Sequence, residues 1–305
     1  MKSRDVWLLL LVTFFWGVTF PLLKIGNRYL PPLSFGAWRF FLGALCLYFW
    51  VVRRRGEVWH KRRDFGPLML LGLLQTTIMG GALHFGSSLV KSGLTSVVLY
   101  SYPFFFTFMA FVLLKEDLSW KQITGMLLGF VGLVLAVDPW RAHLTGPEIA
   151  GLIILLCGAV SWGLASVYLK ARFKEYDKLA VTTYQMLYGS VVLFLIAALI
   201  EGGVHFSWDP VALGIISYTT LFTSALGFAI LLTVQTRYPA GSTSVYLFLV
   251  PVFGVTFSSL ILGEKLTLNL LLGLALVALG IVIVNRMSTQ GRPNYKARIT
   301  VNAGR

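Results

Sequence analysis

Residues 96–108, SVVLYSYPFFFTF, place hydroxyl groups and rings inside an otherwise apolar segment. Four of these residues follow i, i+4, i+7, i+11 spacing and would share one face of a helix: Ser96, Tyr100, Pro103 and Thr107. Such a face could bind an amphipathic solute, because rings offer stacking area and hydroxyls offer hydrogen bonds. Tyr102 belongs to the same cluster. The alternative is that these hydroxyls form hydrogen bonds between packed helices.

A second polar face is expected in the apolar segment 66–89, and it contains a histidine. Its members share helical spacing: Thr77, Gly81, His84 and Ser88. A histidine within a membrane is costly and usually faces the interior of a helix bundle. His84 could exchange a proton near neutral pH, or it could hydrogen-bond to a substrate or a neighbouring helix. Thr77 and His84 are therefore candidate cavity residues.

Two tryptophans and two prolines lie deep within their apolar segments. Trp16 and Trp162 are about ten residues inside, too deep for the interfacial aromatic belt. Each indole could form a stacking platform for a substrate, or it could pack between helices with its N–H bonded. Pro103 and Pro251 lie near mid-depth, so each is either a tolerated kink or a hinge that shapes a site.

The composition indicates that these segments belong to an all-α polytopic membrane protein. The chain has 305 residues, 57% of them hydrophobic and 12% charged, with a mean hydropathy of +0.77. A net charge of +14 could suggest nucleic-acid binding, but the basic residues lie between the apolar segments. Cys46 and Cys157 lie within apolar segments, without the spacing of a metal site or a disulfide framework.

Ten segments are long and apolar enough to be predicted as transmembrane helices. They are residues 5–24, 33–52, 66–89, 93–114, 119–137, 148–169, 179–200, 210–235, 241–262 and 267–285. The first lacks a small-x-small cleavage site and is expected to stay as a span. With both termini on one side, 20 Lys and Arg fall on that side and 5 on the other, so both termini are predicted to be cytoplasmic. Residues 286–305 form a basic tail that is expected to be disordered.

The two halves of the chain repeat each other. Shifted by 148 positions, residues 93–137 align with residues 241–285 without a gap and with 14 identities in 45 positions. Shifted by 146, WGVTFPLLK from Trp16 aligns with WGLASVYLK from Trp162. The predicted repeats, 1–137 and 148–285, have five helices each, so the second would enter the membrane inverted. Ser244 and Phe248 are the counterparts of Ser96 and Tyr100, and are the matching candidates in the second half.

This chain resembles the EamA branch of the drug/metabolite transporter superfamily. FWG at 15–17 and SWG at 161–163 open the repeats. In each repeat a Pro is followed thirteen residues later by EDL (116–118) or EKL (264–266), and then by paired glycines. The resemblance covers about residues 5–285. It implies a transporter of small metabolites, often an exporter of amino acids, with a central cavity between the third, fourth, eighth and ninth helices and the first and sixth beside it.

We therefore predict an inner-membrane carrier of a small amphipathic metabolite that works by alternating access. The ring-rich fourth predicted helix, together with the amino-acid export that is frequent in the family it resembles, favours export of a neutral or aromatic amino acid. A drug-efflux or lipid-linked-sugar carrier on the same fold is the alternative, and an intramembrane enzyme is the alternative of another class. The tyrosines of 96–108 are replaced in the other half by Phe248 and Val250, which makes the tyrosines candidates for substrate recognition.

Several absences and charged residues complete the prediction. No Asp or Glu lies well inside a predicted span, which favours facilitated diffusion or exchange and leaves His84 as the candidate for proton coupling. No P-loop, metal constellation or Ser/His/Asp set is found, so no cofactor and no enzyme activity are expected. The expected partners are a small-molecule substrate and the lipid bilayer, with a homodimer possible.

Lys24, Lys170 and Arg39 are expected to snorkel, although Arg39 could draw an anionic group. Glu116 and Glu264 are expected to cap helices or pair with loops.

Overall fold

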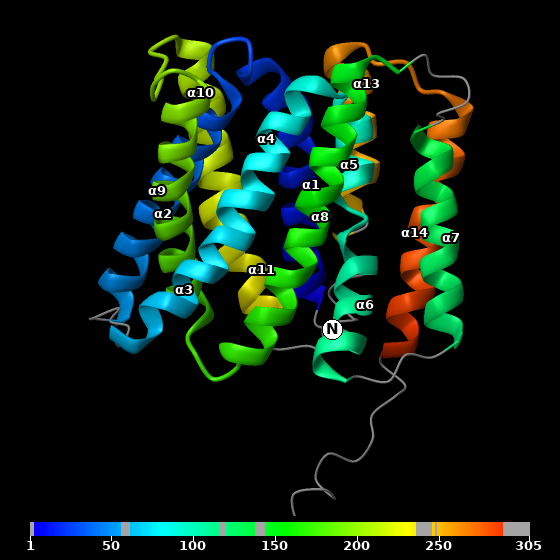
Figure 1. The fold of residues 1–305 in the computed structure, drawn as a ribbon, viewed down its shortest axis with the longest axis horizontal. Coiled ribbons are helices and arrows are strands. Elements are labelled where there is room, and N and C mark those ends of the chain that lie inside the picture. Colours follow the sequence, from blue (N-terminus) through cyan, green and yellow to red (C-terminus); the bar gives the residue numbers. More distant parts are fainter. Residues whose placement is uncertain are drawn as a thin grey trace, which may run out of the picture.

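The computed structural model describes residues 3–55, 62–115, 120–137, 144–235, 246–247 and 249–288. Within these ranges the regular elements are helices, and most lie side by side in a bundle (Figure 1). The uninterrupted long helices are α1 (Ser3–Gly26), α2 (Pro32–Arg55), α7 (Trp120–Val137), α8 (Gly146–Arg172), α9 (Lys178–Ile200), α13 (Leu249–Leu262) and α14 (Leu268–Ser288). Each predicted span overlaps helix in this part of the chain.

Seven helical stretches among the described residues are long and apolar enough to cross a membrane. They are Ser3–Gly26, Pro32–Trp50, Phe65–Leu89, Ser92–Leu114, Gly146–Arg172, Lys178–Ile200 and Pro210–Leu231. Three shorter apolar helices cover Ile123–Ala136, Leu249–Leu262 and Leu268–Gly280. The chain is thus an all-helical multi-pass membrane protein, while ten crossings and cytoplasmic termini stay predictions.

Two of the spans contain a π-helical segment at corresponding positions. One span runs from η1 (Arg62–Asp64) and α3 (Phe65–Gly72) through the π-helix η2 (Leu73–Ile78) to α4 (Met79–Leu89). The other runs from α10 (Pro210–Tyr218) through the π-helix η3 (Thr219–Leu226) to α11 (Gly227–Gln235). Leu73 and Thr219, where the π-helices begin, differ by the 146 positions that relate the repeats. Because π-helices are rare and cluster at functional sites, their repetition in the two halves indicates that both segments contribute to a functional site.

The SVVLYSYPFFFTF segment is two helices and not one kinked helix. α5 (Ser92–Leu99) ends before Tyr100 and Ser101, and α6 (Tyr102–Leu114) begins directly after them. Pro103 lies in the first turn of α6, where a missing N–H costs no intrahelical hydrogen bond. The continuous helical face predicted from Ser96 to Thr107 is therefore wrong, because the helix is interrupted at Tyr100 and Ser101.

Glycines allow two helix crossings that repeat between the halves. A Cβ added at Gly17 in α1 would lie 2.3 Å from Cβ of Phe253 in α13. The counterpart in α8, Gly163, would place a Cβ 3.0 Å from Cβ of Phe105 in α6. The glycine of each WG pair thus lets one helix approach the neighbouring proline-containing helix, and the adjacent tryptophan lies next to that crossing. At one edge, α7 and α14 pack closely together (Figure 1).

Candidate functional site

A cavity of about 50 Å³ lies among helices of both halves. Its lining is mostly aromatic and aliphatic, with one charged side chain: Trp16, Thr19, Phe20, Arg39, Phe40, Met79, Leu83, Leu99, Tyr100, Trp162 and Phe228. Ligand pockets usually measure roughly 300–1,000 Å³, whereas a water needs about 10–15 Å³ of such space. In this conformation the cavity can hold a few waters, and its walls must separate to admit a metabolite.

Two tyrosines at the break between α5 and α6 pack against Trp162 of α8. Tyr102 stacks on Trp162, with ring centroids 3.9 Å apart and planes 13° from parallel. Tyr100 meets Trp162 edge-on at 5.5 Å, and Phe20 meets Tyr100 at 6.2 Å. These offset and edge-on contacts are favourable aromatic geometries. The break between the helices therefore presents both tyrosines to the tryptophan of the second repeat.

A second cavity of about 80 Å³ lies on the other side of Trp162. It is more polar and is lined by Leu71, Gln75, Tyr102, Trp162, Ser166, Leu169, Val181, Thr182, Gln185, Phe228 and Leu231. Trp162 and Phe228 line both cavities, so these two rings separate them. A solute that moved from one cavity to the other would pass the Trp162 ring.

The π-helix η3 supplies acceptors to two residues of the first cavity. The Trp16 Nε1–H donates to the Thr223 carbonyl at 3.0 Å, which satisfies its buried indole. Arg39 Nε donates to Ser224 Oγ at 3.1 Å, and Arg39 Nη2 donates to Thr223 Oγ1 at 2.9 Å. Arg39 is 5% exposed and lies on the Phe40 ring, with 5.1 Å from Cζ to the centroid. The expectation that Arg39 snorkels is wrong, because its guanidinium points into the protein.

His84 is fully buried and contacts this arginine. Its Nε2 lies 3.4 Å from Arg39 Nη1, and its ring meets Phe35 edge-on at 4.8 Å. Arginine has no acceptor, so Nε2 must accept this hydrogen bond and Nδ1 must hold the ring proton. The buried Nδ1 has no hydrogen-bond partner among the residues that the structure describes. His84 borders neither of the two cavities.

Two other predicted cavity residues lie in helix contacts. The Thr77 hydroxyl donates to the Gly189 carbonyl at 2.8 Å and so connects η2 to α9. The Ser96 hydroxyl donates to the Gly93 carbonyl at 2.6 Å, within its own helix. Neither residue borders the two cavities. Thr77 makes a hydrogen bond between helices, whereas the bond of Ser96 stays within its own helix. Ser244 and Phe248 lie outside the described residues.

The prolines hold corresponding positions near the starts of helices. Pro251 is buried near the beginning of α13, as Pro103 is in α6. A hinge role for both prolines stays a prediction. Its structural basis is the break at Tyr100 and Ser101, where the two helical segments meet without a continuous hydrogen-bond ladder.

Charged side chains close helix ends on the side predicted to be external. The Glu264 carboxylate accepts hydrogen bonds from the backbone N–H groups of Ser92 and Gly93 at 2.7 and 2.9 Å, at the start of α5. This confirms the capping prediction for Glu264, whereas Glu116 lies outside the described residues. Lys24 donates to the carbonyls of Ser88 and Val90, both at 3.0 Å, at the end of α4. Lys24 therefore caps the end of a neighbouring helix, and its snorkelling to the membrane surface stays a prediction.

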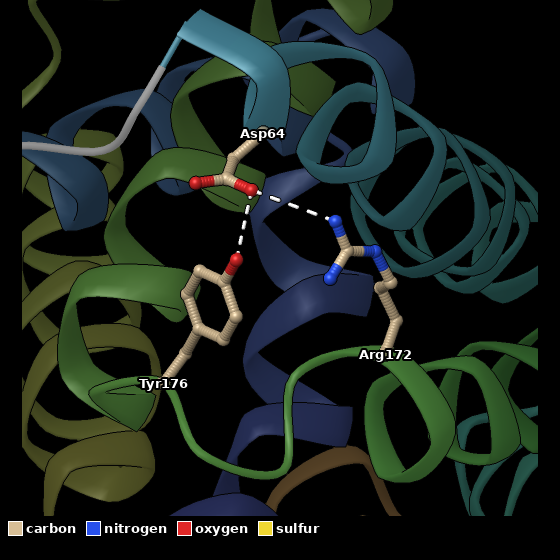
Figure 2. A network of polar contacts seen from close by, with 3 residues as sticks. All are labelled: Asp64, Arg172 and Tyr176. Atoms are coloured by element: carbon tan, nitrogen blue, oxygen red, sulfur yellow. Dashed lines mark hydrogen bonds and ion pairs between the residues drawn. The ribbon is translucent and has the colours of Figure 1, made fainter.

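A polar network joins three elements at the opposite end of the bundle, and the sequence analysis missed it. Asp64, which is 1% exposed, precedes α3. The Tyr176 hydroxyl donates to Asp64 Oδ1 at 2.9 Å, and Arg172 Nη2 lies 3.6 Å from the same oxygen. Figure 2 shows both side chains converging on that carboxylate from the end of α8 and the loop that follows. The sequence did contain a signal for this network, because Asp64 directly follows several basic residues.

The EamA-like transporter family matches the chain over residues 4–137 and 149–286. The chain belongs to this family. YoaV, an uncharacterized transporter of Bacillus subtilis, is similar to it, with 28% identity over 270 residues that cover 88% of this chain and 92% of YoaV. A probable amino-acid metabolite efflux pump of Salmonella typhimurium is 28% identical over 297 residues, which cover 93% and 95% of the two chains.

The overall arrangement of this EamA protein is also found in a solved structure. A chain of one crystal structure superposes with a TM-score of 0.71, and the match covers 96% of this chain and 100% of the other. Sequence identity between the two is 15%, so this similarity shows the fold alone. Family and relatives together identify the chain as a membrane transporter of the drug/metabolite superfamily.

Proposed function

We propose that this EamA transporter exports a small amphipathic metabolite, a neutral or aromatic amino acid, across the inner membrane by alternating access. The observation that supports this most directly is the ring wall of Tyr100, Tyr102 and Trp162, which lies between two small cavities. Stacked and edge-on rings can exchange contacts with one another for contacts with an aromatic or aliphatic solute. The name of the Salmonella relative supports an amino-acid substrate.

Alternating access requires contacts at both ends that can open in turn. At the end predicted to be external, Lys24 joins helix ends across 64 and 66 positions of sequence and Glu264 joins them across 172. At the end predicted to be cytoplasmic, Asp64 joins α3 to the segment between α8 and α9. The two cavities between these ends are too small for a metabolite in this conformation. Opening either end would break polar contacts that water can replace.

The charges around the cavities bear on how transport is driven. No Asp or Glu borders either cavity in the part of the chain that the structure describes. His84 already accepts a hydrogen bond from Arg39, and a protonated ring could not do so. We therefore propose facilitated diffusion or exchange, without proton coupling through His84.

A counterflow screen in proteoliposomes tests the proposal, with amino acids, nucleosides and cationic dyes as separate arms. We expect counterflow of aromatic or other neutral amino acids by the wild type and loss of most of it in Trp162→Ala. Trp208→Ala is the matched control, because Trp208 is 80% exposed and borders neither cavity. Counterflow of dyes or nucleosides without any amino acid would contradict the proposed substrate and favour the alternative carrier classes.

A further inference from the structure

Arg39 is a buried cation in the wall of the first cavity, and its hydrogen-bond partners among the described residues are neutral. Its guanidinium bonds to Ser224, Thr223 and His84, each through a different nitrogen. No acidic residue among those described forms an ion pair with it. A guanidinium has five N–H groups, so three bonds leave one N–H on each terminal nitrogen. A carboxylate can accept hydrogen bonds from two such N–H groups of one guanidinium.

The repeat shows that the scaffold does not need this charge. The counterpart of Arg39 in the second half, 146 positions later, is Gln185. Gln185 lies on α9 and bonds to the π-helix η2, accepting from the Thr76 hydroxyl at 2.8 Å. Arg39 likewise lies on α2 and bonds to the π-helix η3. A neutral amide therefore makes the same kind of helix-to-π-helix contact, so the positive charge at Arg39 has another purpose.

Burial makes a free charge at this position unfavourable unless an anion joins it. Moving a cation out of water is costly, and neutral hydrogen bonds compensate only in part. The cavity that Arg39 borders also contains the rings of Tyr100 and Trp162. Tyr100 contacts Phe20, Tyr102 and Trp162 through its ring, and its hydroxyl is a second group that can bind a polar part of a ligand. The site thus combines one cation, one tyrosine hydroxyl and an aromatic wall.

We propose that Arg39 binds the carboxylate of the transported substrate, while Tyr100 and Trp162 contact its apolar part. This inference rests on the proposed function and narrows it to substrates with a carboxylate. His84 is a positioning residue, because it holds the guanidinium without bordering the cavity. The same charge would repel cations, so cationic dyes are expected to be excluded.

Calorimetric titration of the purified full-length protein tests this with four probes that share a phenyl ring. L-Phenylalanine has a carboxylate and an ammonium group, 3-phenylpropionate only the carboxylate, phenethylamine only the ammonium group, and benzyl alcohol neither. We expect both carboxylates to bind the wild type at least about tenfold more tightly than phenethylamine and benzyl alcohol. Arg39→Gln should weaken carboxylate binding roughly 10- to 100-fold and remove the preference.

Two further variants separate ligand binding from folding. Arg39→Lys keeps the charge but loses the fork, so it should keep part of the carboxylate preference. Arg28→Gln is the matched control, since Arg28 is exposed and borders neither cavity; it should bind like the wild type. If Arg39→Gln fails to fold, the wild-type preference and Arg39→Lys decide the question.

The proposal is overturned if phenethylamine binds the wild type as tightly as 3-phenylpropionate, if neither carboxylate binds, or if folded Arg39→Gln keeps the preference. The counterflow screen judges the proposed function separately. Carboxylate binding without counterflow of any compound would count against the carrier function and not against the Arg39 site. Counterflow that Arg39→Gln leaves unchanged would refute the Arg39 site and leave the carrier function intact.

Discussion

Replacing Gly17 by alanine tests whether the repeated helix crossing holds the cavity together. The added Cβ would lie 2.3 Å from Cβ of Phe253 and 3.2 Å from the backbone N of Gly254. Neither atom is the end of a flexible side chain, so α1 and α13 must separate by about 1 Å to restore van der Waals contact. Because Trp16 directly precedes Gly17 and lines the cavity, this separation would also move a wall of the cavity.

The expected cost is the overpacking penalty less the gain in helix propensity. Overpacking costs about 1–3 kcal/mol, and alanine gains up to about 1 kcal/mol over glycine in a helix. Gly163→Ala should be milder, because its Cβ would lie 2.9 Å from the Phe106 N and 3.0 Å from the Phe105 Cβ. Gly214→Ala is the control, since an added Cβ there meets nothing within 4 Å. Stability should therefore rank Gly214→Ala first, then Gly163→Ala, then Gly17→Ala.

The measurement is the thermal midpoint of unfolding of each variant in detergent, with counterflow in proteoliposomes as the second readout. Gly17→Ala should lower the midpoint by several degrees, at about 2–4 °C per kcal/mol for a domain of roughly 150–250 residues. Gly214→Ala should leave it unchanged or raise it. A Gly17→Ala protein that is as stable and active as the wild type would refute the crossing argument.

Three further substitutions test other parts of the structure. Glu264→Gln should reduce stability by about 1–3 kcal/mol, because it weakens two charge-assisted hydrogen bonds to the start of α5. Glu175→Gln, at an exposed position, is the control and should not reduce stability. Equal thermal midpoints for the two variants would count against the cap. Asp64→Asn should lower the thermal midpoint of unfolding more than Tyr176→Phe does, because only Asp64→Asn removes the negative charge that also attracts Arg172. The reverse order of midpoints would contradict the network. His84→Gln should leave the pH profile of counterflow unchanged between about pH 5.5 and 8, and a flattened profile would restore His84 as a proton carrier.

The helices, the repeat and the tryptophan pair could be predicted because each has a local signal. Apolar length indicates where helices can cross a membrane, and the WG pairs recur at a constant spacing. Glu264 could be predicted as a cap because it lies at the edge of its apolar segment. The π-helices could not be predicted, because they depend on which carbonyl each backbone N–H bonds to, and hydropathy and motif spacing do not contain that information.

The positions of the polar side chains could not be predicted for a different reason. Arg39 was expected to reach the membrane surface because of its place in the segment, yet its partners in η3 turn it inward. Thr77 and Ser96 were candidate cavity residues, but their hydroxyls are used by nearby carbonyls. Whether a hydroxyl faces a cavity depends on which acceptor lies beside it, and spacing on one helix does not contain that information.

The sequence by itself determined the class of this protein, its two repeats and its family, because these depend on hydropathy, spacing and shared motifs along the chain. The tertiary structure alone decided which polar groups remain available to a substrate. Trp16 bonds to a carbonyl 207 positions away and Arg39 to hydroxyls 184 and 185 positions away. Such distant partners meet only when the two halves pack, and the burial of the Arg39 charge beside the cavity is a result of that packing.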